Sequence, residues 1–291
     1  MTKNIFYASL ALITAGVFFV INDAIINYLS SIDIKFYRFI FYGSPAYLIV
    51  PVYLSFKGQL KKHVISSNYY IVLFRSITFA PMPFITFICL KNISLPEFTT
   101  LNMSSPLLAT IFAYFLLKER LNLFIYISLL VGFLGVLFVI QPGFDNFNIY
   151  FLVTLFGVVL ITSTTTIVNK YNNISTATGF FIYGGLTIHL ISFILSVFDP
   201  LKIDFKIFLF ISIASIFINA AIFLSTFAFR AAQKYYASIF CLVYLQIVWS
   251  SIAGYYFFNE YLNKLALLGA ILIILSGLIS IPGQIRQINE K

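Results

Sequence analysis

The sequence predicts an all-α membrane protein with ten transmembrane helices, arranged as two inverted five-helix repeats. Of its 291 residues, 61% are hydrophobic and only 9% are charged, and the mean hydropathy is +0.99. Soluble domains carry about 25% charged residues, so a chain this apolar needs lipid as its solvent. The number and arrangement of the helices follow from two further observations, a series of apolar segments and a pattern that recurs half a chain later.

Apolar segments of about 20 residues recur along the whole chain. As a helix, each is long enough to cross the roughly 30 Å hydrocarbon core of a bilayer. The connections between them are short and leave no room for a soluble domain. The expected spans cover residues 5–29, 36–56, 68–90, 95–117, 123–141, 149–170, 176–197, 207–231, 236–258 and 264–284.

The basic residues indicate the orientation of these spans. Short cytoplasmic loops are enriched in Lys and Arg. With the N-terminus in the cytoplasm, eleven Lys and Arg residues fall on that side and six on the other, and Arg75 lies inside a helix. We therefore expect a multi-pass protein of the cytoplasmic membrane with both termini in the cytoplasm. The net charge of +9 is spread over these loops, so no nucleic-acid partner is expected.

A polar-ended pattern occurs twice, half a chain apart. Tyr114–Asn122 and Tyr255–Asn263 each carry a tyrosine, a glutamate five positions later, and then leucine and asparagine. At the same offset of 141 positions, "FIFYGS" (39–44) aligns with "FFIYGG" (180–185). The chain therefore divides into a first repeat, residues 1–145, and a second, residues 146–291. Because five spans is an odd number, the second repeat enters the membrane from the opposite side, as in many secondary transporters.

The duplication is weak, and chance matching between apolar sequences is the alternative. The third and eighth segments show little similarity, whereas three blocks align at one offset. Small residues also coincide, because Ala109 and Ala113 align with Ser250 and Gly254. This small-xxx-small spacing lets helix backbones approach closely in lipid.

Two tyrosines flank expected helix breaks and are our first substrate-binding candidates. Tyr42 precedes Gly43–Pro45, and Tyr183 precedes Gly184–Gly185 at the corresponding position of the second repeat. Interrupted helices at equivalent positions mark the binding site of inverted-repeat carriers. The structural alternative is that glycine and proline are simply commoner in membrane helices.

Few charged or titratable residues fall within the spans, and these are the candidates for coupling or gating. Asp23 forms a polar edge with Asn27, a candidate binding residue, at i and i+4. Arg38 could pair with Asp23 as a gate, or extend its charge to the interface. The remaining two candidates are Glu97 and His189, and the alternative for His189 is a static hydrogen bond.

The other substrate-binding candidates are polar or amphipathic residues within apolar runs. Arg75 could meet an anionic group of the substrate or form a structural pair. Gln246 and Trp249 share one helix face, while Tyr244 projects elsewhere. Trp249 could stack on a flat or cationic substrate, or pack in the core. The full set is Arg75, Asn27, Asn169, Tyr244, Gln246 and Trp249, together with the two tyrosines.

Several segments together resemble one transporter family. They are "NDAIINYL" (22–29), "FYRF" (36–39), "FRS" (74–76), "LLKERL" (116–121), "GFLGVLFVIQPG" (132–143), "YLQIVWSSIAGYYFFNEYL" (244–262) and "LLGAILIILSG" (267–277). Their order and spacing resemble an EamA-type ten-helix member of the drug/metabolite transporter superfamily. The resemblance implies a central substrate cavity between the halves, with helices 5 and 10 to one side. The first half also resembles rickettsial-type S-adenosylmethionine uptake carriers, and "YLQIVW" resembles metabolite and riboflavin-type carriers.

The expected function is secondary active transport of a small polar metabolite by alternating access. The substrate would be an amino acid, an amine or a nucleoside-like compound such as S-adenosylmethionine. The partners are this substrate and the lipid bilayer, and the oligomeric state is open, a homodimer being one option. No nucleotide-binding loop or catalytic motif occurs, so we expect no enzyme activity, catalytic residue, cofactor or metal. A passive pore and an intramembrane enzyme are the rival functions.

Overall fold

The computed structural model describes residues 2–117, 123–141, 147–171, 174–199, 203–232 and 241–289. Over these ranges the chain is helical and contains no strand. Five helices are long and apolar enough to cross a membrane, namely Phe6–Ser31, Phe36–Phe56, Tyr69–Leu90, Thr178–Val197 and Phe205–Ser225. Shorter apolar helices occupy Tyr126–Ile140, Ile149–Thr164, Leu242–Phe258 and Lys264–Ile279. The prediction of an all-helical membrane protein is confirmed.

The first half of the chain contains eight helices in the described residues. They are α1 (Thr2–Ser31), α2 (Phe36–Phe56), α3 (Leu60–Val64), α4 (Tyr69–Phe79), α5 (Met82–Leu90), α6 (Leu95–Asn102), α7 (Ser105–Leu117) and α8 (Leu123–Ile140). The second half contains α9 (Ile149–Lys170), α10 (Ala177–Val197), α11 (Phe205–Ala232), a 3-10 turn (Cys241–Tyr244), α13 (Leu245–Ala253), a π turn (Gly254–Phe258) and α14 (Lys264–Asn289).

The structure divides two of the predicted spans into shorter helices. The predicted span 68–90 divides into α4 and α5 at Ala80–Pro81, and the span 95–117 divides into α6 and α7 at Met103–Ser104. Proline explains the first break, because it cannot donate a backbone hydrogen bond and restricts the residue before it. The expected interruptions beside Tyr42 and Tyr183 are wrong, since α2 and α10 run through both positions as continuous helices.

The glycines beside the two tyrosines serve close helix approach instead. A Cβ atom built on Gly43 of α2 would lie 2.2 Å from the hydroxyl oxygen of Ser215 on α11. A Cβ atom on Gly184 of α10 would lie 2.3 Å from the Arg75 guanidinium on α4. Both distances are shorter than Cβ contacts in proteins, so a larger side chain at either position would have to displace Ser215 or Arg75.

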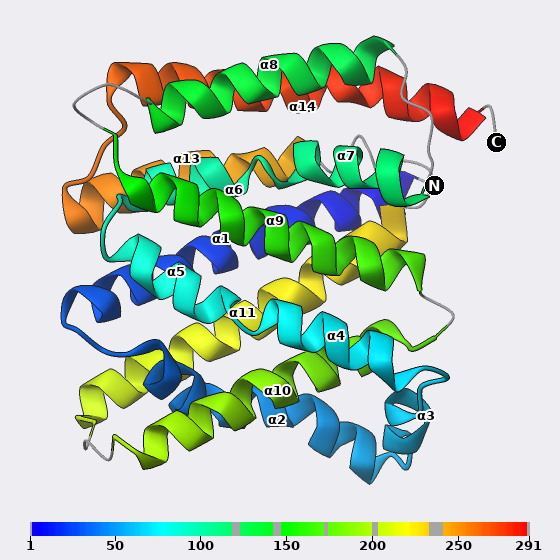
Figure 1. Ribbon diagram of the computed structural model, residues 1–291, viewed down its shortest axis with the longest axis vertical. Helices are drawn as coiled ribbons and strands as arrows, with labels where there is room; N and C mark the ends of the chain where they lie inside the picture. Colours follow the sequence, from blue (N-terminus) through cyan, green and yellow to red (C-terminus); the bar gives the residue numbers. More distant parts are fainter. Residues whose placement is uncertain are drawn as a thin grey trace.

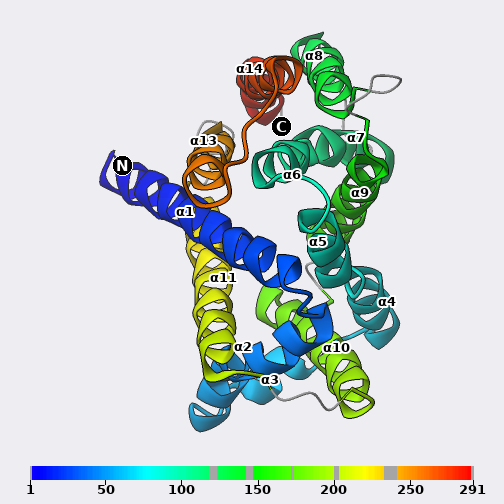
Figure 2. The same ribbon diagram turned by 90° about the vertical axis from the view of Figure 1, so that its left-hand side faces the viewer.

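Helices α8 and α14 form a pair at one side of the molecule (Figures 1 and 2). Their backbones cross where a Cβ atom on Gly269 would lie 2.5 Å from the Gly135 carbonyl oxygen. Two helical turns away on each helix, the Ser128 hydroxyl donates to the Ser276 carbonyl oxygen at 2.7 Å. These helices correspond to the expected spans 123–141 and 264–284, and they lie together at one side, as the family resemblance implies.

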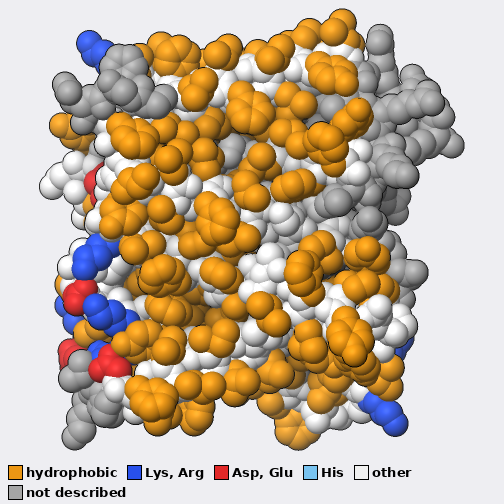
Figure 3. Space-filling view, viewed as in Figure 1, with side chains coloured by type: hydrophobic (Ala, Val, Ile, Leu, Met, Phe, Trp, Pro, Cys, Tyr) orange, Lys and Arg blue, Asp and Glu red, His pale blue; other side chains and the backbone are white. Residues whose placement is uncertain are grey.

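The helices run between two faces of the molecule. Helix α1 begins and α14 ends on the same side, at the right in Figure 1. We call this side the N-terminal face and the other the opposite face. Figure 3 shows hydrophobic side chains over most of the visible surface, while many charged side chains gather along its left edge, at the opposite face. This distribution suits a protein whose sides contact lipid and whose ends contact water.

Candidate functional site

The polar edge of α1 lies near the opposite face. The Asn22 side chain donates to the Asp23 carboxylate at 3.0 Å, and within the described chain no ion pair includes Asp23. The Asn27 amide, one turn later, donates to both carboxylate oxygens of Glu260 at 3.3 and 3.4 Å. Asp23 and Asn27 therefore share a helix face, as predicted, but bind different partners.

Glu260 joins three segments that are distant in sequence. Besides Asn27, its carboxylate accepts the backbone N–H of Leu95 at 2.8 Å. Leu95 is the first residue of α6, whose N–H lacks a partner inside its own helix. A carboxylate at a helix N-terminus is also favoured by the helix dipole. We call the cluster of Glu260, Leu95 and Asn27 the Glu260 junction.

The Glu260 junction combines opposing effects on its carboxyl group. Burial is the largest and raises the pKa of Glu260, whereas the hydrogen bonds from Leu95 and Asn27 lower it and the negative Glu97 raises it. Glu97 itself lies in the first turn of α6, where it completes a capping box with Ser94. Glu97, an expected gating candidate, therefore forms a local helix cap rather than a contact inside the helix bundle.

Arg38 pairs with a residue other than the one predicted. Its guanidinium forms an ion pair with Asp199, and the Tyr37 hydroxyl donates to the same carboxylate at 2.5 Å. The predicted pair with Asp23 is wrong. Arg38 lies in the first turn of α2, and Asp199 follows α10, which packs against α2. The Tyr37 hydrogen bond, followed by Arg38, lowers the pKa of Asp199, while desolvation opposes them.

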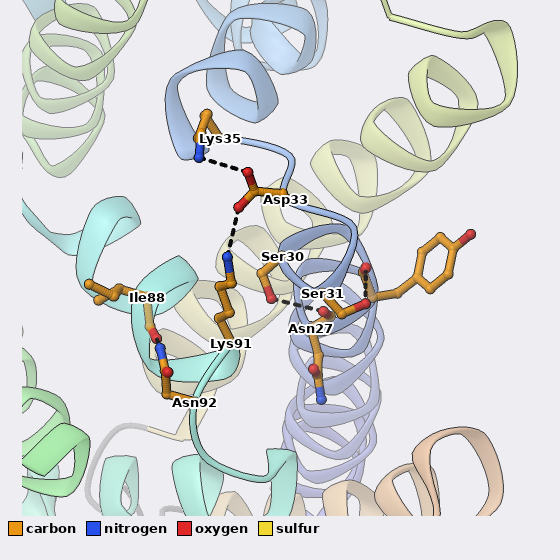
Figure 4. Close-up of polar contacts among 9 residues, drawn as sticks. Asn27, Ser30, Ser31, Asp33, Lys35, Ile88, Lys91 and Asn92 are labelled. Carbon is orange, nitrogen blue, oxygen red and sulfur yellow. Dashed lines mark hydrogen bonds and ion pairs between the residues drawn. The ribbon is translucent and has the colours of Figure 1, made fainter.

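A second carboxylate, Asp33, bridges connections at the opposite face. It forms ion pairs with Lys35 at 3.0 Å and with Lys91 at 2.7 Å, as Figure 4 shows. These two hydrogen-bonded cations lower the pKa of Asp33 to about 2. The Asp33 side chain is 63% exposed, so water and salt screen both pairs.

Tyr183 lies at an interface near the N-terminal face. Its hydroxyl donates to the Val64 carbonyl oxygen at 2.8 Å, and its ring meets that of Tyr69 edge-on. Nearby, the Ser66 hydroxyl donates to the Ile174 carbonyl oxygen at 3.1 Å. These bonds hold the α2–α4 connection against the start of α10. Tyr42 instead packs edge-on against Phe208 of α11, so the structure does not bring the two tyrosines together.

Arg75 reaches from α4 to α10. Its guanidinium donates to the Phe180 carbonyl oxygen at 3.1 Å and lies 4.9 Å from the Phe79 ring centre. Its Nε atom is buried and has no hydrogen-bond partner in the described structure. The ion pairs found in this part of the chain do not include Arg75. A guanidinium in a spanning segment is costly unless something compensates its charge.

His189 forms a hydrogen bond within its own helix, which is the structural alternative considered for it. Its Nδ1 atom lies 2.7 Å from the Gly185 carbonyl oxygen one turn earlier, and its ring stacks on Tyr47 with centroids 4.4 Å apart. The Tyr47 hydroxyl donates to the Ile182 carbonyl oxygen at 2.5 Å. His189 and Tyr47 therefore fix α2 against α10.

The remaining candidates occupy or precede α13. Gln246 contacts α1, because a Cβ atom on Gly16 would lie 3.1 Å from its Cγ. The Trp249 indole nitrogen is buried and finds no acceptor among the described residues. Tyr244 is 3% exposed and packs against Gly277 of α14, away from the other candidates. The side chain of Asn169 lies outside the described residues, as does Glu119 of the first repeated pattern.

One groove on the surface is apolar and contains none of the candidates. It has a volume of about 470 Å³ and lies along α13, the π turn and α14. Its walls are Ile247, Val248, Ser251, Ile252, Tyr255, Tyr256, Leu262, Leu267, Ala270, Ile271 and Ile274. The polar candidates therefore belong to interfaces between helices rather than to this groove. Glu260 was missed as a site residue, although its repeated pattern was the available signal.

Known proteins resemble the chain in sequence and in fold. A model of the EamA-like transporter family matches residues 2–141. An uncharacterized transporter of Helicobacter pylori is 24% identical over 100% of both chains. An S-adenosylmethionine uptake transporter of Rickettsia prowazekii is 25% identical, over 97% of this chain and 93% of that protein, and one of Rickettsia conorii is 26% identical, over 93% and 90%.

A crystal structure shares the fold, with a TM-score of 0.64 over 94% of this chain and 96% of that chain at 14% identity. The family match covers the first half, and the relatives align along nearly the whole length. The protein is therefore a multi-pass membrane protein that is similar to transporters along nearly its whole length, and its residues 2–141 match the EamA-like transporter family.

Proposed function

We propose that the protein is a secondary active transporter that moves a small metabolite carrying a carboxylate across the cytoplasmic membrane by alternating access. The observation that carries this proposal is Arg75, a cation within a spanning segment. Among the described residues, its Nε has no hydrogen-bond partner and no carboxylate forms an ion pair with it. A planar guanidinium binds carboxylates through two parallel hydrogen bonds. The carboxylate of a transported molecule would compensate this charge during each cycle.

The substrate class is an amino acid or an amino-acid conjugate of a nucleoside, such as S-adenosylmethionine. Two relatives are named as uptake transporters of that compound. Its amino-acid carboxylate suits Arg75, and its adenine offers a flat ring with hydrogen-bond acceptors. Trp249 would bind the adenine ring. Its indole is amphipathic, and its N–H is buried without an acceptor among the described residues, so it could donate to the ring.

The proposed architecture is two inverted repeats, residues 1–145 and 146–291. It is supported by contacts that recur at the sequence offset of 141. Moving the Gly135–Gly269 crossing by this offset gives the positions of Ser276 and Ser128, which are hydrogen-bonded. Likewise, the crossing of Gly43 with Ser215 and that of Gly184 with Arg75 are equivalent within one residue. Both termini would be cytoplasmic, because the charge bias favours that orientation.

Alternating access is supported by polar contacts that join the two halves of the chain at both faces. The Glu260 junction and the Arg38–Asp199 pair join the halves at the opposite face. The bond from Tyr183 to Val64 joins them at the N-terminal face. A carrier opens one such set while it keeps the other. A passive pore, the rival function, needs a continuous polar path instead.

The test is uptake and counterflow of radiolabelled S-adenosylmethionine in proteoliposomes. Proteoliposomes that are loaded with unlabelled substrate should accumulate labelled substrate transiently, which a pore cannot bring about. Arg75→Gln should reduce the rate at least tenfold, by the ~1.5–3 kcal/mol of a hydrogen bond to a charged group. Lys91→Gln, which removes an exposed cation, is the control and should leave the rate unchanged. Equal rates for Arg75→Gln and the parent protein would overturn the role of Arg75, and linear equilibration without overshoot would establish the passive alternative.

A further inference from the structure

The Glu260 carboxylate connects the two halves of the chain at a place where both have backbone and side-chain donors. Glu260 follows the π turn of the second half, whereas Leu95 begins α6 and Asn27 ends the polar edge of α1 in the first half. One half-buried side chain therefore holds together three segments that would have to separate if the opposite face opened.

Packing and a backbone turn bring the Glu260 carboxylate to the start of α6. A Cβ atom on Gly254 would lie 2.7 Å from the Pro96 ring of α6, so the end of α13 lies directly against the start of α6. The chain then reverses at Asn259, which has a φ of +54°, and the Glu260 N–H donates to the Gly254 carbonyl oxygen at 3.0 Å. This turn places the Glu260 carboxylate over the N-terminus of α6.

Asp33 offers a comparison on the same face. Its ion pair with Lys91 joins the α1–α2 connection to the end of α5, and its second partner, Lys35, lies in that same connection (Figure 4). Its partners are flexible, exposed lysines, so opening would replace them with water at little cost. Glu260 instead accepts the backbone N–H of Leu95 at a helix start, for which the described residues offer no other acceptor. If that bond breaks, both groups need water as a replacement partner, because an unpaired buried N–H or carboxylate is costly.

We propose that Glu260 is the positioning residue that keeps the opposite face of the transporter closed, and that its release from Leu95 and Asn27 accompanies opening of that face. This inference rests on the proposed alternating-access function. It assigns no contact with substrate to Glu260. Its effect is on the ratio of the two facing states and hence on which face admits water and substrate.

The experiment measures water access beside the Glu260 junction without any substrate. Ser30 is 3% exposed, lies one turn after Asn27, and donates to the Asn27 carbonyl oxygen at 2.8 Å (Figure 4). Ser30→Cys, in a protein whose Cys89 and Cys241 are replaced by alanine, would report access to a membrane-impermeant thiol reagent added at the opposite face. The parent reporter protein should react slowly.

Glu260→Ala should raise the reaction rate of this reporter roughly tenfold, because a hydrogen-bonded charge is lost. Glu260→Gln, which keeps an acceptor for Leu95, should give a smaller increase. Asp33→Asn is the matched control, since it removes a carboxylate on the same face and asparagine tolerates the φ of +63°. It should leave the rate unchanged. An unchanged rate in Glu260→Ala, or an equal increase in Asp33→Asn, would overturn the proposal.

A second variant keeps the test decisive if Glu260→Ala does not fold. Asn27→Ala removes the other side of the contact and should also raise the rate, and the two substitutions together should be less than additive. Additive or absent effects would contradict the proposed contact. The readout also separates the two proposals. A labelling change in a protein that transports no S-adenosylmethionine would overturn the substrate only, whereas normal transport with unchanged labelling would overturn the role of Glu260.

Discussion

Arg38 and Asp199 form an ion pair in which one partner is buried and the other is partly exposed, with side-chain exposures of 8% and 32%. Removal of the exposed partner leaves a buried, uncompensated cation, whereas removal of the buried partner leaves a carboxylate that water and Tyr37 still solvate. We expect Asp199→Asn to lower the melting temperature in detergent by roughly 5 °C. Arg38→Gln should lower it less. The reverse order, measured by a thiol-independent thermal assay, would contradict the pair's assignment.

Acid should weaken the same pair. The folded-state pKa of Asp199 is lowered, chiefly by the Tyr37 hydrogen bond, so its stabilisation is present above the unfolded value of about 3.9. That stabilisation is lost as the pH falls through the folded-state pKa. Melting temperatures between pH 6 and pH 3 should therefore fall less steeply in Asp199→Asn than in the parent protein. Asp33→Asn separates the contribution of Asp33, whose pKa is lowered to about 2; identical pH profiles for all three proteins would refute both contributions.

The two tyrosines should matter for different reasons. The Tyr183 hydroxyl donates to the Val64 carbonyl oxygen near the N-terminal face, whereas the Tyr42 hydroxyl makes no hydrogen bond in the described structure. We expect Tyr42→Ala and Tyr183→Ala each to reduce transport at least tenfold at normal membrane abundance. Tyr183→Phe should be impaired as well, by the ~1 kcal/mol of one hydrogen bond. Rates near those of the parent protein in both alanine variants would leave the tyrosines as packing residues.

Composition and segment length sufficed to predict the all-helical membrane fold, because lipid leaves a chain few other solutions. They failed at local detail. Gly43 and Gly184 were interpreted as breaks, yet each lies in a continuous helix and permits a close crossing with Ser215 or Arg75. Sequence alone does not distinguish these uses of glycine, since the crossing helix comes from a distant segment.

The polar candidates show the same limit. Asp23 and Asn27 were correctly placed on one face, because i,i+4 spacing is local. The partner of Arg38 was wrong, because the α10 end that brings Asp199 to α2 is set by packing between halves. The repeated pattern containing Glu260 was recognised, but its bond to Leu95 depends on a turn at Asn259 that sequence periodicity does not reveal.

The topology can be tested with reporters fused to truncated and full-length chains. We expect a fusion after Lys291 to be active as a cytoplasmic reporter, because α1 begins and α14 ends on the same side (Figure 1). A fusion in the segment around Asp204 should be active only as a periplasmic reporter. Periplasmic activity after Lys291 would mean an odd number of spans and would contradict the arrangement of two inverted five-helix repeats.

Proton coupling can be assigned by charge removal, since the candidates are few. A proton-coupled carrier needs a group that titrates between the two facing states. His189 is held by Gly185 and Tyr47, and Glu97 is held in a capping box. Asp23 accepts only the Asn22 amide and has no ion-pair partner in the described chain. Its carboxylate is therefore the one free to exchange a proton as the surroundings change.

We expect Asp23→Asn to abolish substrate accumulation driven by an imposed pH difference but to spare counterflow, because exchange needs no net proton movement. Asparagine keeps the size and the acceptor for Asn22, so loss of folding would not explain this split. Asp33→Asn is the matched control and should retain accumulation. If Asp23→Asn still accumulates substrate, Asp23 is not the coupling group. If Glu97→Gln and His189→Gln retain accumulation as well, transport is driven by another ion, by exchange, or by the substrate gradient itself.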